Sequence, residues 1–141
     1  MPQPLVRKVK ETIVVADDDR TVVLLVSELL SQKGFQAVAA FDAMQVMLMV
    51  RQYHPRAVIL DIGMPGGSGM DVLRKLKLMH PTSHIPVLIL TGLLDPKLAR
   101  EAKQLGASEF LTKPVDLSAL YAALLRALGR EPQDSRDDQP S

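Results

Sequence analysis

The chain has 141 residues, of which 47% are hydrophobic and 23% are charged, and its formal net charge is +1 at pH 7. This size and composition fit one globular domain. The near-neutral charge excludes a general field that would attract nucleic acid or an anionic membrane. The chain has no cysteine, which excludes disulfides, thiolate metal sites and cysteine nucleophiles.

The two ends of the chain differ from its middle. Residues 1–11 are basic and contain proline, and residues 130–141 are polar with no large apolar side chain to bury. We therefore expect a flexible N-terminal tail over 1–11, one domain over 12–129 and a disordered C-terminal tail over 130–141. No apolar h-region follows the basic start and no segment is apolar enough to span a bilayer, so we expect a cytoplasmic location and no membrane partner.

Short apolar runs alternate along the chain with segments of helical periodicity. Five runs are rich in aliphatic residues and predict buried strands: 12–16, 35–40, 57–60, 86–90 and 108–111. Apolar residues recur at helical spacing after each run, within 20–33, 42–54, 72–79, 96–105 and 117–128. Five strand–helix units in series predict an α/β fold of the flavodoxin-like kind, a doubly wound five-stranded parallel sheet in the order 2-1-3-4-5.

Polar side chains interrupt the apolar pattern at the carboxyl ends of the predicted strands. These residues are Asp17, Asp18 and Asp19 after the first strand, Asp61 after the third, Thr91 after the fourth and Lys113 after the fifth. Ligands of an open parallel sheet bind at the carboxyl edge where the strand order reverses, and strands one and three flank that point. We therefore expect the aspartates of these two strands to face each other.

Several carboxylates in one crevice repel each other, so they need a cation or a proton to coexist. An all-oxygen ligand set of this kind favours Mg²⁺. The lysine and the hydroxyl nearby indicate phosphoryl chemistry, in which Asp61 is the nucleophile. The metal and Lys113 would neutralise charge on the transferred group, and Thr91 would donate a hydrogen bond to it.

Other polar residues have simpler interpretations. Four aspartates precede predicted helices and are expected to cap them, namely Asp19, Asp42, Asp95 and Asp116. Three histidines lie in loops near the opposite ends of the strands, namely His54, His80 and His84. They form no ligand pair in the sequence, so we assign them no metal role.

Four sequence blocks resemble the receiver domain of two-component response regulators. They are VVADDD (14–19), VILDIGMPGGSG (58–69), LILTG (88–92) and FLTKP (110–114). Each block alone is weakly or moderately specific, but together, in this order and spacing, they are strongly specific over residues 12–128. We expect a stand-alone regulator similar to those of chemotaxis, since no output domain is recognised after the last predicted helix.

The resemblance implies a role for each matching residue at the acidic end. Asp17, Asp18, Asp61 and the backbone carbonyl of Gly63 would bind Mg²⁺, and Asp61 would accept the phosphoryl group. The residues that would hold this group are Thr91, the backbone amide of Gly92, and Lys113. Thr91 and the aromatic Phe110 would form the switch, and the bond from Lys113 to Pro114 would be cis.

The sequence departs from the family pattern in three places. Position 63 is glycine where relatives carry larger or polar residues, and Phe110 stands where tyrosine is frequent, so the switch must act through packing alone. Residues 66–68 lack the acidic residue often found in this loop. We expect an open glycine-rich loop to admit water to the acyl phosphate and to shorten its lifetime.

The resemblance implies a signalling switch rather than an enzyme. A histidine kinase or histidine phosphotransfer protein would donate the phosphoryl group to Asp61, and the chain would assist its own phosphorylation and dephosphorylation. The helix 96–105, the strand 108–111 and the helix 117–128 would form the responsive surface, which would bind an unidentified target protein and not nucleic acid directly. Apolar side chains of the last helix would favour a homodimer through this surface: Leu120, Tyr121, Leu124 and Leu125.

Three alternatives compete with this interpretation. A haloacid-dehalogenase-like phosphatase or phosphotransferase needs a second acid two residues after its aspartyl nucleophile, where this chain has Gly63. A flavodoxin-like flavin carrier needs a phosphate-binding loop after the first strand, where the acidic run 17–19 would repel the phosphate. A receiver-like scaffold that is not phosphorylated would not need the acidic pocket, in which every expected side chain is present.

Overall fold

The computed structural model describes residues 9–65 and 69–131. Three segments lie outside the described residues, namely 1–8, 66–68 and 132–141. Parts of the expectations for the two tails and for the glycine-rich loop fall on these segments. The elements in chain order are β1 (Thr12–Ala16), α1 (Arg20–Gln32), β2 (Gln36–Ala40), α2 (Ala43–Tyr53), β3 (Ala57–Leu60), α3 (Gly69–Leu78), β4 (Val87–Thr91), α4 (Pro96–Gln104), β5 (Glu109–Thr112) and α5 (Leu117–Ala127).

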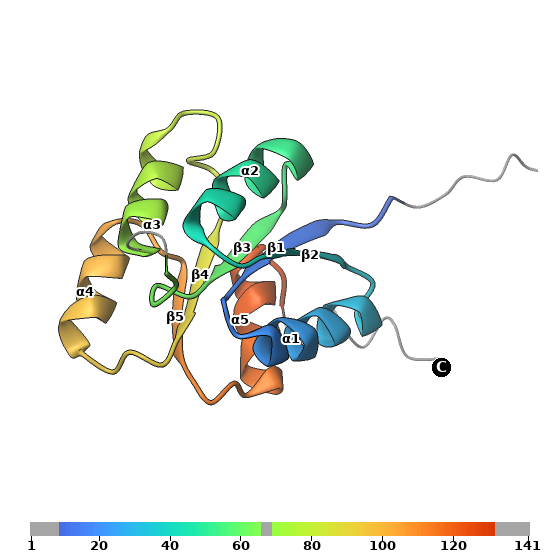
Figure 1. The fold of residues 1–141 in the computed structure, drawn as a ribbon. Coiled ribbons are helices and arrows are strands. Elements are labelled where there is room, and N and C mark those ends of the chain that lie inside the picture. The colour runs from blue at the N-terminus through green and yellow to red at the C-terminus, as the bar shows by residue number, and fades with distance from the viewer. Residues whose placement is uncertain (1–8, 66–68, 132–141) are drawn as a thin grey trace, which may run out of the picture.

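The five strands form one parallel sheet in the order β2-β1-β3-β4-β5, which confirms the predicted fold. Helices α2, α3 and α4 cover one face of the sheet, and α1 and α5 cover the other (Figure 1). Successive strand residues point to opposite faces, so β1 places Val14 in one core cluster and Ile13 and Val15 in the other. Both faces are covered, which explains why β1, β3 and β4 are almost continuously apolar.

The predicted helix caps are confirmed. Each capping carboxylate accepts a backbone N–H of the first helical turn, in the pairs Asp19 with Thr21, Asp42 with Gln45, Asp95 with Lys97, and Asp116 with Ala119. The largest boundary difference is the start of α3, which begins at Gly69 instead of near Val72. Sequence reasoning assigned Gly69 to the loop because glycine is a poor helix former, but here it occupies a buried position at the first turn.

The expected apolar surface on α5 is absent from the structure. Leu120, Leu124 and Leu125 are at most 3% exposed, and Tyr121 is half-buried. Leu120 and Leu124 belong to the core cluster that α5 shares with α1 and the sheet. The prediction was wrong because α5 packs against both the sheet and α1. A wide stripe of its apolar side chains is therefore buried.

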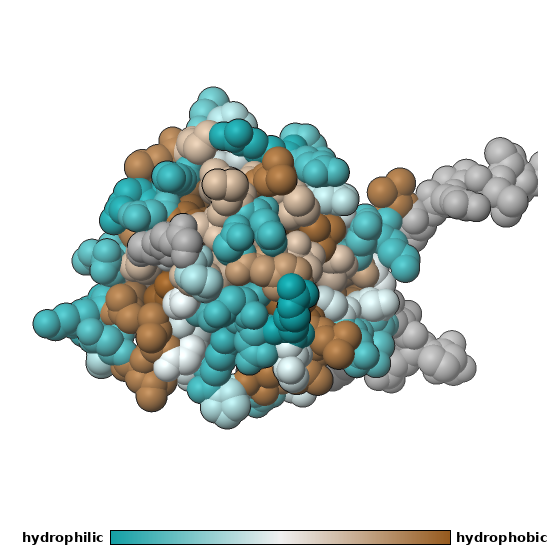
Figure 2. Space-filling view, in the orientation of Figure 1, coloured by the Kyte–Doolittle hydropathy of each residue, from teal (hydrophilic) through white to brown (hydrophobic). Residues whose placement is uncertain are grey.

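Exposed apolar side chains occur elsewhere, on several different elements. The largest exposed fractions belong to Val9, Met44, Leu78 and Leu94. On the face shown in Figure 2, hydrophobic residues are scattered among hydrophilic ones, as is usual for protein surfaces. None of the described helices has the length and apolar character needed to cross a bilayer.

Gly69 brings the start of α3 directly against the chain that follows β3. A Cβ at this position would lie 2.2 Å from the Cα of Ile62 and 3.0 Å from the backbone oxygen of Asp61. These are main-chain atoms, which cannot rotate away as a side chain would. The missing side chain therefore sets how closely α3 approaches the segment that carries Asp61.

We expect Gly69→Ala to lower the free energy of unfolding by about 3 kcal/mol, because the new methyl group overlaps backbone. Chemical denaturation would measure the change. Gly92→Ala is the matched control, since its Cβ would meet only the Cδ of Lys113 at 3.9 Å. Equal effects of the two substitutions would contradict the close-packing argument.

Candidate functional site

The carboxyl ends of β1 and β3 bring the predicted acidic residues together. Ala16 pairs with Leu60 in the sheet, so the next residues, Asp17 and Asp61, are neighbours. The backbone N–H of Asp61 donates to the carbonyl of Ala16 at 2.9 Å and holds this register. Asp17, Asp18 and Asp61 each offer a carboxylate oxygen, and these oxygens all lie within 4.8 Å of one another.

The three carboxylates differ in their exposure to solvent. Asp17 and Asp61 are buried, with 2% and 6% of their surface exposed, whereas Asp18 is exposed. Asp17 also accepts the backbone N–H of Asp19 at 2.9 Å, which fixes the turn between β1 and α1. The cluster therefore has two buried carboxylates at its base and one at its mouth.

Lys113 bridges the two buried carboxylates. Its Nζ lies 2.7 Å from Oδ2 of Asp17 and 3.0 Å from Oδ2 of Asp61. The backbone N–H of Lys113 donates to the carbonyl of Thr91 at 2.8 Å, so β4 positions the residue that follows β5. The bond to Pro114 is cis, as predicted. Three carboxylates face one ammonium, so the cluster retains an excess of negative charge.

Burial and the neighbouring charges shift the acid–base properties of this cluster. Burial raises the pKa of Asp17, and the charge of Asp61 adds to this effect, which outweighs the hydrogen bonds from Lys113 and Asp19. Partial burial alone would lower the pKa of Lys113, but its hydrogen bonds to Asp17 and Asp61 and their charges raise it overall. The lysine is thus held as an ammonium, while Asp17 is costly to keep ionised.

The donor set fits a hard divalent cation. All of its side-chain ligands are carboxylate oxygens, the type that Mg²⁺ prefers. A cation would also offset the negative charge that Lys113 leaves uncompensated. His54, His80 and His84 take no part, because the acidic cluster is the only group of three or more potential ligands among the described residues.

Asp61 is oriented by contacts to both of its oxygens. Oδ1 accepts the backbone N–H of Gly63 at 2.8 Å, and Oδ2 faces Lys113. A Cβ on Gly63 would lie 3.3 Å from Oδ1 and 3.6 Å from Cδ1 of Leu93. Gly63 therefore leaves a gap beside the carboxylate, and Leu93 borders this gap from the loop after β4.

Thr91 and Phe110 lie on neighbouring strands near this edge of the sheet. Thr91 is fully buried at the end of β4, and its Oγ1 accepts the backbone N–H of Leu93 at 3.3 Å. Phe110 pairs with Ile89 in the sheet and is half-buried against the core cluster on the side of α2, α3 and α4. Strand pairing thus links Phe110 to the element that ends in Thr91.

Sequence reasoning missed two residues at this edge. An exposed leucine in a loop carries no chemical signal, so the sequence does not indicate Leu93, although it follows Thr91 by only two residues. Arg20 was passed over as the first residue of α1, but its guanidinium lies 4.3 Å from the ring centroid of Phe41, which follows β2. This cation–π contact joins the start of α1 to the loop after β2.

A model of the response regulator receiver domain family matches residues 13–125. The chain belongs to this family. Sporulation initiation phosphotransferase F of Bacillus subtilis is 29% identical over 118 residues, which cover 84% of this chain and 94% of that protein. Response regulator PleD of Caulobacter vibrioides is 36% identical over 118 residues, but the match covers only 26% of that longer protein.

Solved structures of receivers resemble the whole described domain. A putative response regulator from Chloroflexus aurantiacus superposes with a TM-score of 0.80 at 25% identity, covering 86% of this chain and 99% of that one. The receiver domain of NtrX from Brucella abortus has a TM-score of 0.76 at 33% identity, covering 83% and 98%. The chain is therefore a receiver of two-component signalling that has the acidic cluster of Asp17, Asp18 and Asp61.

We expect Asp17→Asn to raise the free energy of unfolding of the metal-free receiver by about 1 kcal/mol. The folded-state pKa of Asp17 is raised above its ordinary value of 3.8, so the folded protein binds this proton more tightly than the unfolded chain. Wild-type stability should therefore increase as the pH falls through the raised pKa and level off below 3.8. The variant should lack this increment.

Denaturation in the presence of a chelator, repeated over a pH series, would measure both effects. Asp71→Asn is a suitable control, because its carboxylate is 57% exposed and pairs with Arg74 at the surface, where ion pairs contribute little. A loss of stability in Asp17→Asn at neutral pH would contradict the assignment of Asp17 as a destabilising buried charge.

Proposed function

We propose that this receiver accepts a phosphoryl group on Asp61 from a histidine kinase or a histidine phosphotransfer protein, in a reaction that depends on Mg²⁺. The observation that carries the proposal is the setting of Asp61. Its buried carboxylate lies beside two further aspartates and 3.0 Å from the Nζ of Lys113. A structural aspartate at a strand end would need none of these neighbours.

In the proposed reaction, a carboxylate oxygen of Asp61 attacks phosphorus. A P–O bond forms to Asp61 while the P–N bond of the donor phosphohistidine breaks, and the electron pair of that bond stays on the imidazole nitrogen. The second half of the cycle is hydrolysis, in which water attacks phosphorus, the P–O bond to Asp61 breaks, and inorganic phosphate leaves the restored carboxylate. The chain assists both steps but is not a classical enzyme, because its own side chain is the substrate.

The residues proposed to hold Mg²⁺ are Asp17, Asp18, Asp61 and the backbone carbonyl of Gly63. When bound, the ion would neutralise charge that develops on the transferred oxygens. The raised pKa of Lys113 keeps its ammonium charged. The ammonium would therefore be attracted to the phosphoryl oxygens and would move toward them from Asp17 and Asp61. The Thr91 hydroxyl and the backbone N–H of Gly92 would donate hydrogen bonds to the same group.

The proposed output is a change of the surface formed by α4, β5 and α5. Helix α4 has a single buried residue, Ala102, so little burial opposes its movement. A shift of Thr91 toward the phosphoryl group would open space near β5, and Phe110 would respond by packing, since it has no hydroxyl. The changed surface would bind a target protein. A homodimer through the same surface stays a prediction. The leucine side chains of α5 that would have supported it are buried in the core.

An aspartyl phosphatase is the less favoured candidate, because the residue two positions after Asp61 is Gly63. No carboxylate at that position protonates a leaving group, as such an enzyme would require. A scaffold without phosphorylation is also less favoured, since burying Asp17 and Asp61 together is costly and gives a scaffold no evident benefit.

The test is to incubate the purified protein with acetyl phosphate, with and without Mg²⁺, and to follow its intact mass. We expect one added phosphoryl group that requires Mg²⁺ and is lost in Asp61→Asn. If no adduct accumulates, the phosphate analogue beryllofluoride should still bind in the presence of Mg²⁺. Steady hydrolysis of unrelated phosphate esters, or failure of both reagents to bind, would contradict the proposal.

The gap beside Asp61 predicts a short-lived phosphoryl group, because Gly63 leaves room for water. We expect Gly63→Ala to lengthen the half-life of the phosphorylated form about threefold, since the new methyl group narrows the approach to the acyl phosphate. Loss of the adduct mass over time would measure the rate, with the exposed Ser118→Ala as control. A wild-type half-life of many hours would contradict this prediction.

A further inference from the structure

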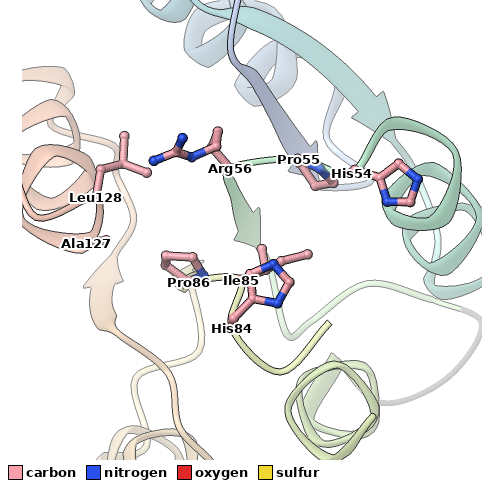
Figure 3. Close-up of a pocket in the computed structure, with 8 residues that line it drawn as sticks. All are labelled: His54, Pro55, Arg56, His84, Ile85, Pro86, Ala127 and Leu128. Atoms are coloured by element: carbon pink, nitrogen blue, oxygen red, sulfur yellow. The ribbon is translucent and has the colours of Figure 1, made fainter. Parts of the chain in front are cut away.

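A cleft of about 390 Å³ lies at the end of the sheet opposite the acidic cluster. Its lining comes from residues just before β3 and β4 and from the end of α5, as Figure 3 shows: His54, Pro55, Arg56, His84, Ile85, Pro86, Ala127 and Leu128. The acidic residues follow the carboxyl ends of the same strands. The cleft and Asp61 are therefore separated by the length of β3, roughly 15 Å, and the cleft has no part in the proposed phosphoryl transfer.

The cleft combines apolar walls with polar groups at its rim. Pro55, Ile85, Pro86 and Leu128 supply the walls. The polar groups are the guanidinium of Arg56 and the imidazoles of His54 and His84, whose residues are all exposed. In Figure 3 the Arg56 side chain extends across the cleft toward Leu128, whereas His54 lies at the end of α2 and His84 lies on the loop before β4. All three groups can donate hydrogen bonds, because a neutral imidazole retains one N–H.

The lining of the cleft includes one permanently charged residue, the cation Arg56. Arg56 pairs with Glu11 at 3.3 Å, but the same carboxylate also accepts two hydrogen bonds from Arg130, at 2.8 Å and 2.7 Å. Two guanidinium groups thus share one carboxylate, and the longer contact is that of Arg56. Arg56 therefore keeps donor capacity for an additional anion.

The two histidines also stand beside an adjoining hollow of about 140 Å³, which is lined in addition by Arg51 and Pro81. His54 has a φ of 46°, and it is the one residue other than glycine with a positive φ among those described. This left-handed turn ends α2 and directs the chain into Pro55 at the wall of the cleft. The imidazole is thereby placed at the rim that the two hollows share.

We propose that this cleft binds a small organic anion that has one acidic group on a short apolar body. The acidic group contacts the guanidinium of Arg56, and the apolar body lies against Pro55, Pro86 and Leu128. The volume lies at the small end of the range for ligand pockets. A metal ion is a poorer match, because the residues that line the cleft include two imidazoles and no carboxylate.

The test uses 2-naphthalenesulfonate as the probe, because a sulfonate is anionic and cannot transfer a phosphoryl group to Asp61. Titration of the full-length ¹⁵N-labelled protein would be followed by ¹H–¹⁵N correlation spectra. We expect saturable shifts of the backbone amides of residues 54, 56, 84 and 128. The neutral analogue 2-naphthol should bind about tenfold more weakly, because it lacks the charge that Arg56 recognises.

Arg56→Gln should weaken binding of the probe about tenfold, and the fold should survive because Glu11 keeps its contacts to Arg130. Arg74→Gln is the matched control, since Arg74 is a similarly exposed arginine on α3 that pairs with Asp71.

Two results would overturn the proposal. One is the absence of saturable shifts at the cleft amides up to the solubility limit of the probe. The other is equal binding of the sulfonate to wild type, Arg56→Gln and Arg74→Gln, which would indicate nonspecific apolar contact. Neither result would bear on phosphorylation of Asp61. The acetyl phosphate experiment tests the acidic cluster, which lies at the opposite end of the sheet from the cleft.

Discussion

Electrostatic repulsion among three carboxylates is the constraint on which the site depends. Asp17 and Asp61 are buried side by side, with their oxygens and one of Asp18 within 4.8 Å. Burial strengthens their repulsion because the surrounding dielectric is low. Lys113 offsets part of it through two contacts of 3.0 Å or less. The remaining negative charge makes the apo site costly to the fold and suited to a cation and a phosphoryl group.

The aliphatic sheet is what makes this arrangement possible. Strands β1, β3 and β4 are buried on both faces, and their hydrogen bonds fix the register of the residues that follow them. Asp17, Asp61 and Thr91 therefore occupy set positions although each belongs to a different strand. Gly69 adds a second constraint, because α3 packs against the backbone after Asp61 with no room for a side chain. The stability of the core thus maintains a locally unfavourable cluster.

The two ends of the sheet present different polar groups. Carboxylates gather at the carboxyl edge, whereas Arg51, Arg56 and the two cleft histidines gather at the amino edge. The chain as a whole is nearly neutral, so this difference is a matter of placement and not of composition. The ligands that we propose differ accordingly, a cation with a phosphoryl group at one end and an organic anion at the other.

Much of this could be predicted from the sequence, for identifiable physical reasons. Buried parallel strands require apolar runs, and helix starts require side-chain acceptors, so β1, β3 and the four capping aspartates were identified correctly. The α5 surface was predicted incorrectly, because periodicity shows that a helix has an apolar stripe but not how much of that stripe its neighbours cover. The contacts of Leu93 and Arg20 were missed for a related reason, since both link segments that are far apart in the chain.

The sequence by itself determined the fold class, the family and the residues able to carry the chemistry, because these follow from local patterns and motif spacing. Only the tertiary structure decided which groups meet. It placed Lys113 between Asp17 and Asp61, brought Leu93 to the gap beside Gly63, and set Arg56 and His84 around one cleft. Such contacts depend on how loops from separate strands pack, and no single stretch of sequence records that packing.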